Sequence, residues 1–146
     1  MEAIRHFRHA ISLWPSYSDP HYNLGVCLLA SGDDDGAMDQ FREVFRLQPD
    51  DALARRHLAD ALRGRAGEEY AKGSLPDAIQ DLREVLQLNP KDIDSCNNLG
   101  TVLARAGKLA EAETYSRRAL QIDPDNAAAP RNLALAQSLL SKEKRQ

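Results

Sequence analysis

The chain has 146 residues, of which 42% are hydrophobic, 28% are charged and only 5% are aromatic, and its net charge is -3. This length is that of one domain, and the residue types that dominate favour helix over strand. The acidic balance argues against a general binder of nucleic acid or anionic membranes, and no apolar run has the length of a membrane span or a signal peptide.

The first predicted element, residues 2–14, is a single amphipathic helix. Ala3, Phe7 and Ala10 recur at helical spacing, and Pro15 then prevents the helix from continuing. The interval of twelve residues from Ala3 to Pro15 returns three times along the chain. The later pairs are Ala37 and Pro49, Ala78 and Pro90, and Ala112 and Pro124.

A second landmark follows each proline by nine residues, where a leucine precedes a glycine or alanine, as at 24–25 and 99–100. The small residue allows a neighbouring helix to approach closely. Each unit therefore consists of two amphipathic helices, and Asp51, Asp92 and Asn126 are expected to cap the N-termini of the helices that follow the prolines. Ser74 and Asp77 are expected to form a capping box at a later helix start.

This pattern resembles the tetratricopeptide repeat (TPR) family, whose signature combines W-x2-L-G-x2-Y, A-x3-F and P over 34 residues. The resemblance covers almost the whole chain and extends to the TPR arms of O-GlcNAc transferases and of bacterial TPR proteins. It implies an all-α fold, a right-handed α-solenoid of stacked helix-turn-helix units with about eight helices. The departures from the signature are His21 and Cys96 for tryptophan, Leu28 and Leu103 for tyrosine, and Ser116 for the second-helix aromatic residue.

The register of the repeat divides this single TPR domain, residues 1–146, into units. The expected division is a half repeat with only its second helix at 2–17, repeats at 18–51, 52–92 and 93–126, a capping helix at 127–140, and a frayed tail at 141–146.

The repeat at 52–92 is seven residues longer than its neighbours, since the prolines are spaced 34, 41 and 34 residues apart. The extra residues lie within 60–73, at the end of the first helix or in its turn. Seven residues are about two helical turns, so helix is favoured over loop, although Gly64 and Gly67 each cost a helix about 1 kcal/mol. The charged residues there suggest a solvated protrusion, with a partner-specific contact as the secondary interpretation: Arg63, Arg65, Glu68, Glu69 and Lys72.

One recurrence has no core role. Asn23, Asn98 and Asn132 each directly precede the leucine of a first helix, and His57 takes this position in the remaining repeat. The resemblance implies that first helices line a concave groove and that this position faces it. An amide both donates and accepts hydrogen bonds, so a row of asparagines can bind the backbone of an extended peptide. Neighbouring positions complete the predicted peptide-binding site: Tyr22, Asn97, Thr101 and Arg131.

The sequence therefore predicts a non-catalytic protein–protein interaction module or scaffold that binds a peptide or protein segment in its groove. The carboxylate clamp of chaperone-binding TPR domains is not expected, because Tyr22, Val26 and Asp94 stand where it needs lysine- and asparagine-type residues.

The alternative is an oligomerisation or spacer arm of a larger protein, an enzyme included. Such an arm would form a homodimer through Ile4, Phe7 and Ile11, a face that the half repeat leaves open.

Neither catalysis, a cofactor nor a metal is expected. His6, His9 and Glu2 share one helix face, for which solvation is the favoured interpretation over metal binding. The acidic run at 32–36 lacks the spacing of a calcium loop and aligns with a turn into a second helix, where acids favour the N-terminus. Cys27 and Cys96 lie far apart in apolar helical contexts, which indicates reduced thiols and a cytoplasmic protein.

Overall fold

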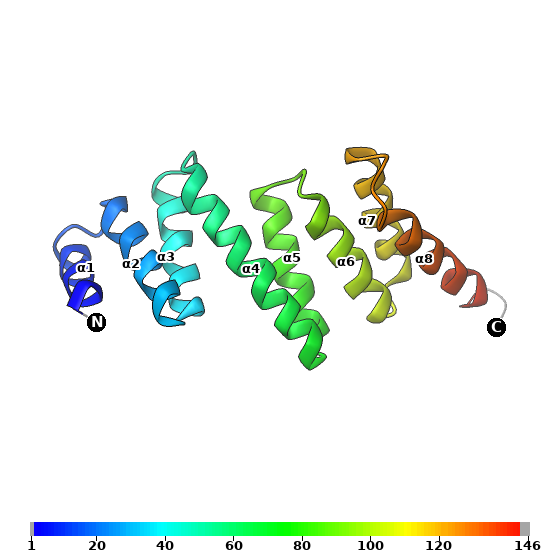
Figure 1. Cartoon of the computed structure of the whole chain (residues 1–146), viewed down its shortest axis with the longest axis horizontal. Helices are drawn as coiled ribbons and strands as arrows, with labels where there is room; N and C mark the ends of the chain where they lie inside the picture. Colours follow the sequence, from blue (N-terminus) through cyan, green and yellow to red (C-terminus); the bar gives the residue numbers. More distant parts are fainter. Residues whose placement is uncertain (1, 144–146) are drawn as a thin grey trace. The chain divides into compact units, whose positions relative to one another are not determined.

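The computed structural model describes residues 2–143, and this part of the chain consists of helices joined by short turns (Figure 1). The helices are α1 (Glu2–Leu13), α2 (Ser18–Ser31), α3 (Asp34–Leu47), α4 (Ala52–Lys72), α5 (Leu75–Leu88), α6 (Ile93–Arg105), α7 (Leu109–Ile122) and α8 (Ala129–Glu143). The chain forms two compact units, residues 1–61 and 62–146, whose boundary falls inside α4.

In the first unit α1 packs on α2 and α2 packs on α3. The leucine–glycine landmark allows α2 and α3 to approach closely. A Cβ on Gly25 would lie only 2.8 Å from the ring of Phe41. Leu24, Leu28 and Val44 are buried around this contact. The predicted close approach of the helices at the glycine is therefore confirmed here.

In the second unit α5, α6, α7 and α8 pack in sequence, and the end of α4 contributes Ala66 to their shared core. Gly100 again faces the next helix, but Ser116 occupies the place that Phe41 fills in the first unit. A Cβ on Gly100 would lie 3.1 Å from the hydroxyl oxygen of Ser116. This buried hydroxyl donates to the carbonyl of Ala112, which satisfies it within its own helix.

The predicted helix caps are present after the prolines. The carboxylate of Asp51 accepts from the backbone N–H groups of Leu53 and Ala54, and that of Asp92 accepts from Ser95. The side chain of Asn126 caps α8 in the same way through the N–H groups of Ala128 and Ala129. These bonds fix where each helix begins.

The cap of α5 differs from the expected capping box. The Ser74 hydroxyl makes no bond to the backbone of the first turn and instead donates to the carboxylate of Asp77. Here the hydroxyl acts as a donor to a charged acceptor, which is a stronger bond than one to a neutral acceptor, and not as the acceptor that a capping box requires.

The seven extra residues of the longer repeat are helical. α4 is one uninterrupted helix of 21 residues, against 14 in each of α3 and α5 (Figure 1). It ends before Gly73, whose φ of 85° lies in the left-handed region that favours glycine. The insertion therefore extends the first helix of its pair by about two turns.

Residues 141–143 of the predicted tail continue the last helix. α8 continues to Glu143, and the Ser141 hydroxyl donates to the carbonyl of Gln137 one turn earlier. The remainder of the predicted tail, 144–146, lies outside the described residues.

Candidate peptide-binding surface

The first unit holds three of the predicted site residues. Asn23 is exposed on α2, and its amide donates to the carbonyl of Asp19 one turn earlier at 2.9 Å. Tyr22 and His57 are half-buried and pack on Phe41, with ring centroids 5.9 and 5.3 Å away. These two rings extend the aromatic core of the unit, whereas Asn23 keeps the exposed position that was expected of it.

The second unit brings Asn98 and Thr101 to the rim of a cavity of about 150 Å³. Both residues are exposed on successive turns of α6, and the Thr101 hydroxyl donates to the carbonyl of Asn97. The rest of the lining comes from α4, α5 and α6: Arg63, Ala66, Gly67, Tyr70, Leu82 and Val102. The cavity therefore has polar groups at the Asn98 and Thr101 side and apolar groups over much of the remainder.

Four of the lining residues, Arg63, Ala66, Gly67 and Tyr70, belong to the stretch that holds the seven-residue insertion. The spacing of the repeat singles out this stretch by its length but does not by itself place these side chains in a binding site. The available signal was the pair of glycines inside a helical segment, because two costly residues in one helix indicate a local requirement.

Ion pairs attach the inserted turns to their neighbours, so the prediction of a solvated protrusion is wrong for Arg63 and Arg65. Arg63 donates to the carboxylate of Asp92 at 2.6 Å, and Arg65 makes a two-point bond to Asp81. Asp81 is buried on α5, so α4 supplies the positive charge that this carboxylate needs. Lys72 forms ion pairs with Glu68 and Glu69 on its own helix, and its side chain is exposed to solvent.

The predicted site residues Asn97 and Asn132 connect α6 to α8. Asn97 is only 8% exposed, and its amide donates to the side chain of Asn126 at 3.0 Å. The Asn132 amide donates to the Asn97 carbonyl at 3.3 Å. The expectation that Asn97 lines a groove is therefore corrected, because neighbouring residues on a helix point about 100° apart and Asn98 takes the outward direction.

Arg131 is exposed on α8, and its Nε donates to the carbonyl of Ala127 in the same segment. Among the side chains of residues 2–142 no group of three histidine, cysteine or acidic residues could hold a metal ion, and His6 lies 3.7 Å from Glu2. Over the same range no helix combines the length and the apolar character that crossing a membrane requires.

Successive helix-turn-helix pairs that pack through a leucine–glycine landmark define an α-helical repeat protein of the α-solenoid class. The chain belongs to the tetratricopeptide repeat family: family models described as "Tetratricopeptide repeat" match residues 2–61 and 93–122, and one described as "TPR repeat" matches residues 67–107. Repeats of this family are in general protein–protein interaction modules.

The chain is 34% identical over 107 residues to the protein CTR9 homolog of Arabidopsis thaliana, a match that covers 72% of this chain and 9% of that protein. It spans between 7 and 11% of the length of the first curated relatives it matches.

Two solved structures share the fold. A crystal structure of MamA protein has a TM-score of 0.58 at 20% identity, covering 94% of this chain and 72% of that one. The first TPR of Spaghetti (RPAP3), bound to the HSP90 peptide SRMEEVD, has a TM-score of 0.53 at 19% identity, covering 85% of this chain and 93% of that one.

Proposed function

We propose that this chain is a non-catalytic interaction module that binds an extended segment of a partner protein on the surface formed by α4 and α6 of the second unit. The carrying observation is the position of Asn98, whose exposed amide lies at the rim of a cavity with an apolar interior. This arrangement combines a group that can bond a peptide backbone with space for a peptide side chain.

The chemistry of an amide suits this role. One asparagine side chain can donate to a backbone carbonyl and accept from a backbone N–H, so it recognises an extended peptide whatever its sequence. The side-chain pocket then supplies selectivity, as in other complexes of extended peptides. Asn23 occupies the equivalent position of α2 in the first unit and offers the same chemistry there.

A peptide-bound TPR among the structural neighbours supports the kind of ligand proposed. The carboxylate clamp of chaperone-binding TPR domains is not carried over, since Asp94 is an exposed acid where a clamp needs a base. We also propose the repeat units that the sequence predicts, a cytoplasmic location, and no nucleic-acid or membrane partner.

The proposal is tested by capturing partners from a lysate on the immobilised chain, identifying them by mass spectrometry and titrating a purified partner. Asn98→Ala should weaken this partner at least about fivefold, because it removes two hydrogen bonds worth about 0.5–1.5 kcal/mol each. Gln121→Ala, which removes an exposed amide from α7, is the matched control and should leave affinity unchanged. Equal affinities for the wild-type chain and the Asn98 variant would contradict the proposed surface.

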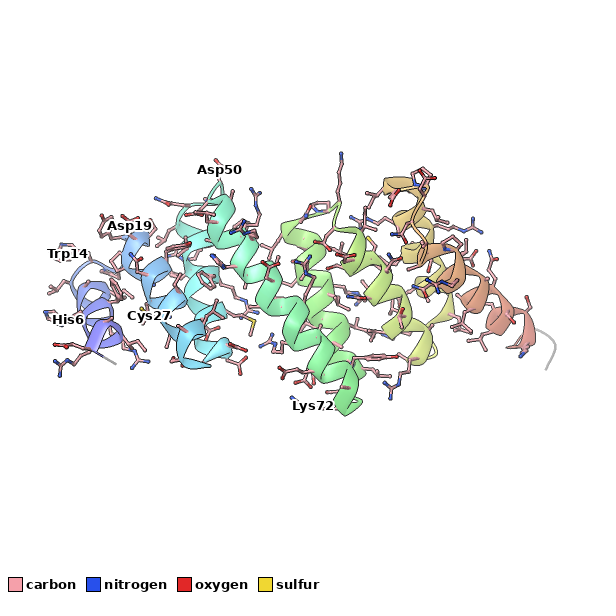
Figure 2. All side chains as sticks on the ribbon, in the orientation of Figure 1. His6, Trp14, Asp19, Cys27, Asp50 and Lys72 are labelled. Atoms are coloured by element: carbon pink, nitrogen blue, oxygen red, sulfur yellow. The ribbon has the colours of Figure 1, made fainter. Side chains whose placement is uncertain are left out.

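A second candidate function is self-association through α1, and the exposed aromatic residue beside that helix favours it. Ile4, Phe7 and Ile11 are half-buried, no residue of α1 is fully buried, and Trp14 after α1 is 61% exposed (Figure 2). In this role the chain would be an oligomerisation or spacer arm of a larger protein. Light scattering should then show a concentration-dependent dimer that Trp14→Glu and Phe7→Glu abolish and that the exposed control His9→Glu retains. A monomer at every concentration would remove this candidate.

A further inference from the structure

The fold of this chain does not require a glycine at position 67. It lies in the interior of α4, its φ is not positive, and a Cβ built on it would meet nothing within 4 Å. Neither backbone conformation nor packing against this chain excludes alanine, although alanine favours the helix by about 1 kcal/mol. Gly67 also lines the cavity beside Asn98.

We propose that the two extra turns of α4 form a pocket for one apolar side chain of the bound peptide, and that Gly67 sets the size of the side chain accepted. This inference rests on the proposed function and adds its selectivity. Glycine at position 67 keeps the cavity open to a side chain from outside, which explains why a residue unfavourable to the helix stands there.

The size and lining of the cavity define the apolar part of the ligand. Its volume of about 150 Å³ equals that of an engineered apolar cavity known to admit benzene, so it has room for a side chain such as leucine, methionine or phenylalanine. Ala66, Leu82 and Val102 line it with apolar atoms, and Tyr70 adds an aromatic ring. The bonds of Arg63 to Asp92 and of Arg65 to Asp81 hold the α4 wall in place without the ligand.

Charge defines the neighbouring part of the ligand. No carboxylate lines the cavity, and the guanidinium of Arg105 lies 4.6 Å from the centroid of the Tyr70 ring. Arg105 also donates to the Tyr70 carbonyl, and no described carboxylate pairs with it. Thr101 and Arg105 are four residues apart on α6, about 6 Å, which is about two residues of an extended peptide. An acidic residue about two positions from the apolar one would therefore face Arg105, while Asp94 lies toward the opposite end of α6.

The test selects a phage-displayed library of random linear peptides on the full chain. The expected peptides carry a large apolar residue with aspartate or glutamate about two positions away. Gly67→Leu should weaken the selected peptides about tenfold or more, because the new side chain occupies the pocket, and should shift a repeated selection to smaller apolar residues. Gly64→Leu is the matched control: position 64 is also open within 4 Å but does not line the cavity, so affinity should stay unchanged.

The outcomes separate this inference from the proposed function. Failure to enrich any peptide, or enriched peptides that bind Asn98→Ala as well as wild type, overturns the proposed surface and the pocket with it. Peptides that are sensitive to Asn98→Ala but unaffected by Gly67→Leu overturn the pocket alone. The role of charge is tested with a selected peptide and a version of it that has glutamine in place of the acidic residue. The acidic peptide should bind the wild-type chain more tightly than the glutamine version, and the two should bind Arg105→Gln equally. Equal binding of the two peptides to the wild-type chain overturns the role of charge. Circular dichroism of both leucine variants confirms that they remain helical.

Discussion

The guanidinium of Arg65 donates two hydrogen bonds to the carboxylate of Asp81, from Nε to Oδ2 and from Nη2 to Oδ1, both at 2.7 Å. The two residues differ in their access to water, since the side chain of Arg65 is 31% exposed and that of Asp81 only 5%. This pair joins the inserted turns of α4 to α5, and its asymmetry gives the first prediction.

Loss of the arginine should cost more stability than loss of the aspartate charge. Arg65→Met leaves a buried carboxylate without this donor and should lower the free energy of unfolding by about 2–3 kcal/mol. Asp81→Asn still accepts a hydrogen bond, and the arginine can turn toward solvent, so we expect a cost of about 1 kcal/mol. Urea denaturation at neutral pH measures both values. Equal costs would show that burial of Asp81 does not govern the pair.

The glycines of α4 and of its end should respond to alanine with opposite signs. Gly64→Ala and Gly67→Ala should each raise the free energy of unfolding by about 0.5–1 kcal/mol, because both positions are helical and open. Gly73→Ala should lower it by about 1–2 kcal/mol, because φ there is 85°. Thermal and urea unfolding of the three variants check the signs. A stabilising Gly73→Ala would contradict the left-handed helix end.

The helices and the length of the insertion can be predicted from the sequence because the repeat register depends only on the number of residues between the recurring prolines and leucines. Asp92 caps α6 and Gly25 contacts Phe41 as the pattern predicts. The contacts of the inserted turns could not be predicted, since the pairing of Arg65 with Asp81 depends on how the longer helix is rotated against α5.

The same limit applies to the candidate site. Asn97 and Asn98 are chemically identical neighbours, and only the packing of α8 on α6 makes the first buried and the second exposed. Gly64 and Gly67 likewise look equivalent in the sequence, yet only Gly67 lines the cavity. Side-chain direction, not residue type, separates the members of both pairs.

The two leucine–glycine landmarks should differ in their tolerance of alanine. In Gly25→Ala the added methyl would lie 2.8 Å from the Phe41 ring, so we expect a loss of about 1–3 kcal/mol from overpacking. In Gly100→Ala the nearest atom is the hydroxyl oxygen of Ser116 at 3.1 Å, and a smaller strain is offset by the higher helix propensity of alanine. We expect a change within about 0.5 kcal/mol there. Chemical denaturation tests this difference, and equal losses at both glycines would contradict it.

The two cysteines should differ in reactivity. Cys96 is fully buried in the second unit, and burial raises the pKa of its thiol, whereas Cys27 is half-buried in the first. Because the thiolate is the reacting species, iodoacetamide should modify Cys27 well before Cys96, as peptide mass spectrometry would show. Faster modification of Cys96 would contradict its burial in the native state.

The raised pKa of Cys96 also predicts how stability depends on pH. The native state holds the thiol proton to a higher pH than the unfolded chain, in which the pKa of the thiol is about 8.5. In the alkaline range above that value the unfolded chain binds fewer protons, so this residue's contribution to stability is present at neutral pH and is lost as the pH rises through the native pKa. Unfolding free energies measured from neutral to alkaline pH should therefore fall less steeply for Cys96→Ala than for the wild-type chain. Cys27→Ala serves as the control, and identical slopes for wild type and Cys96→Ala would show that the Cys96 thiol does not contribute to the alkaline loss of stability.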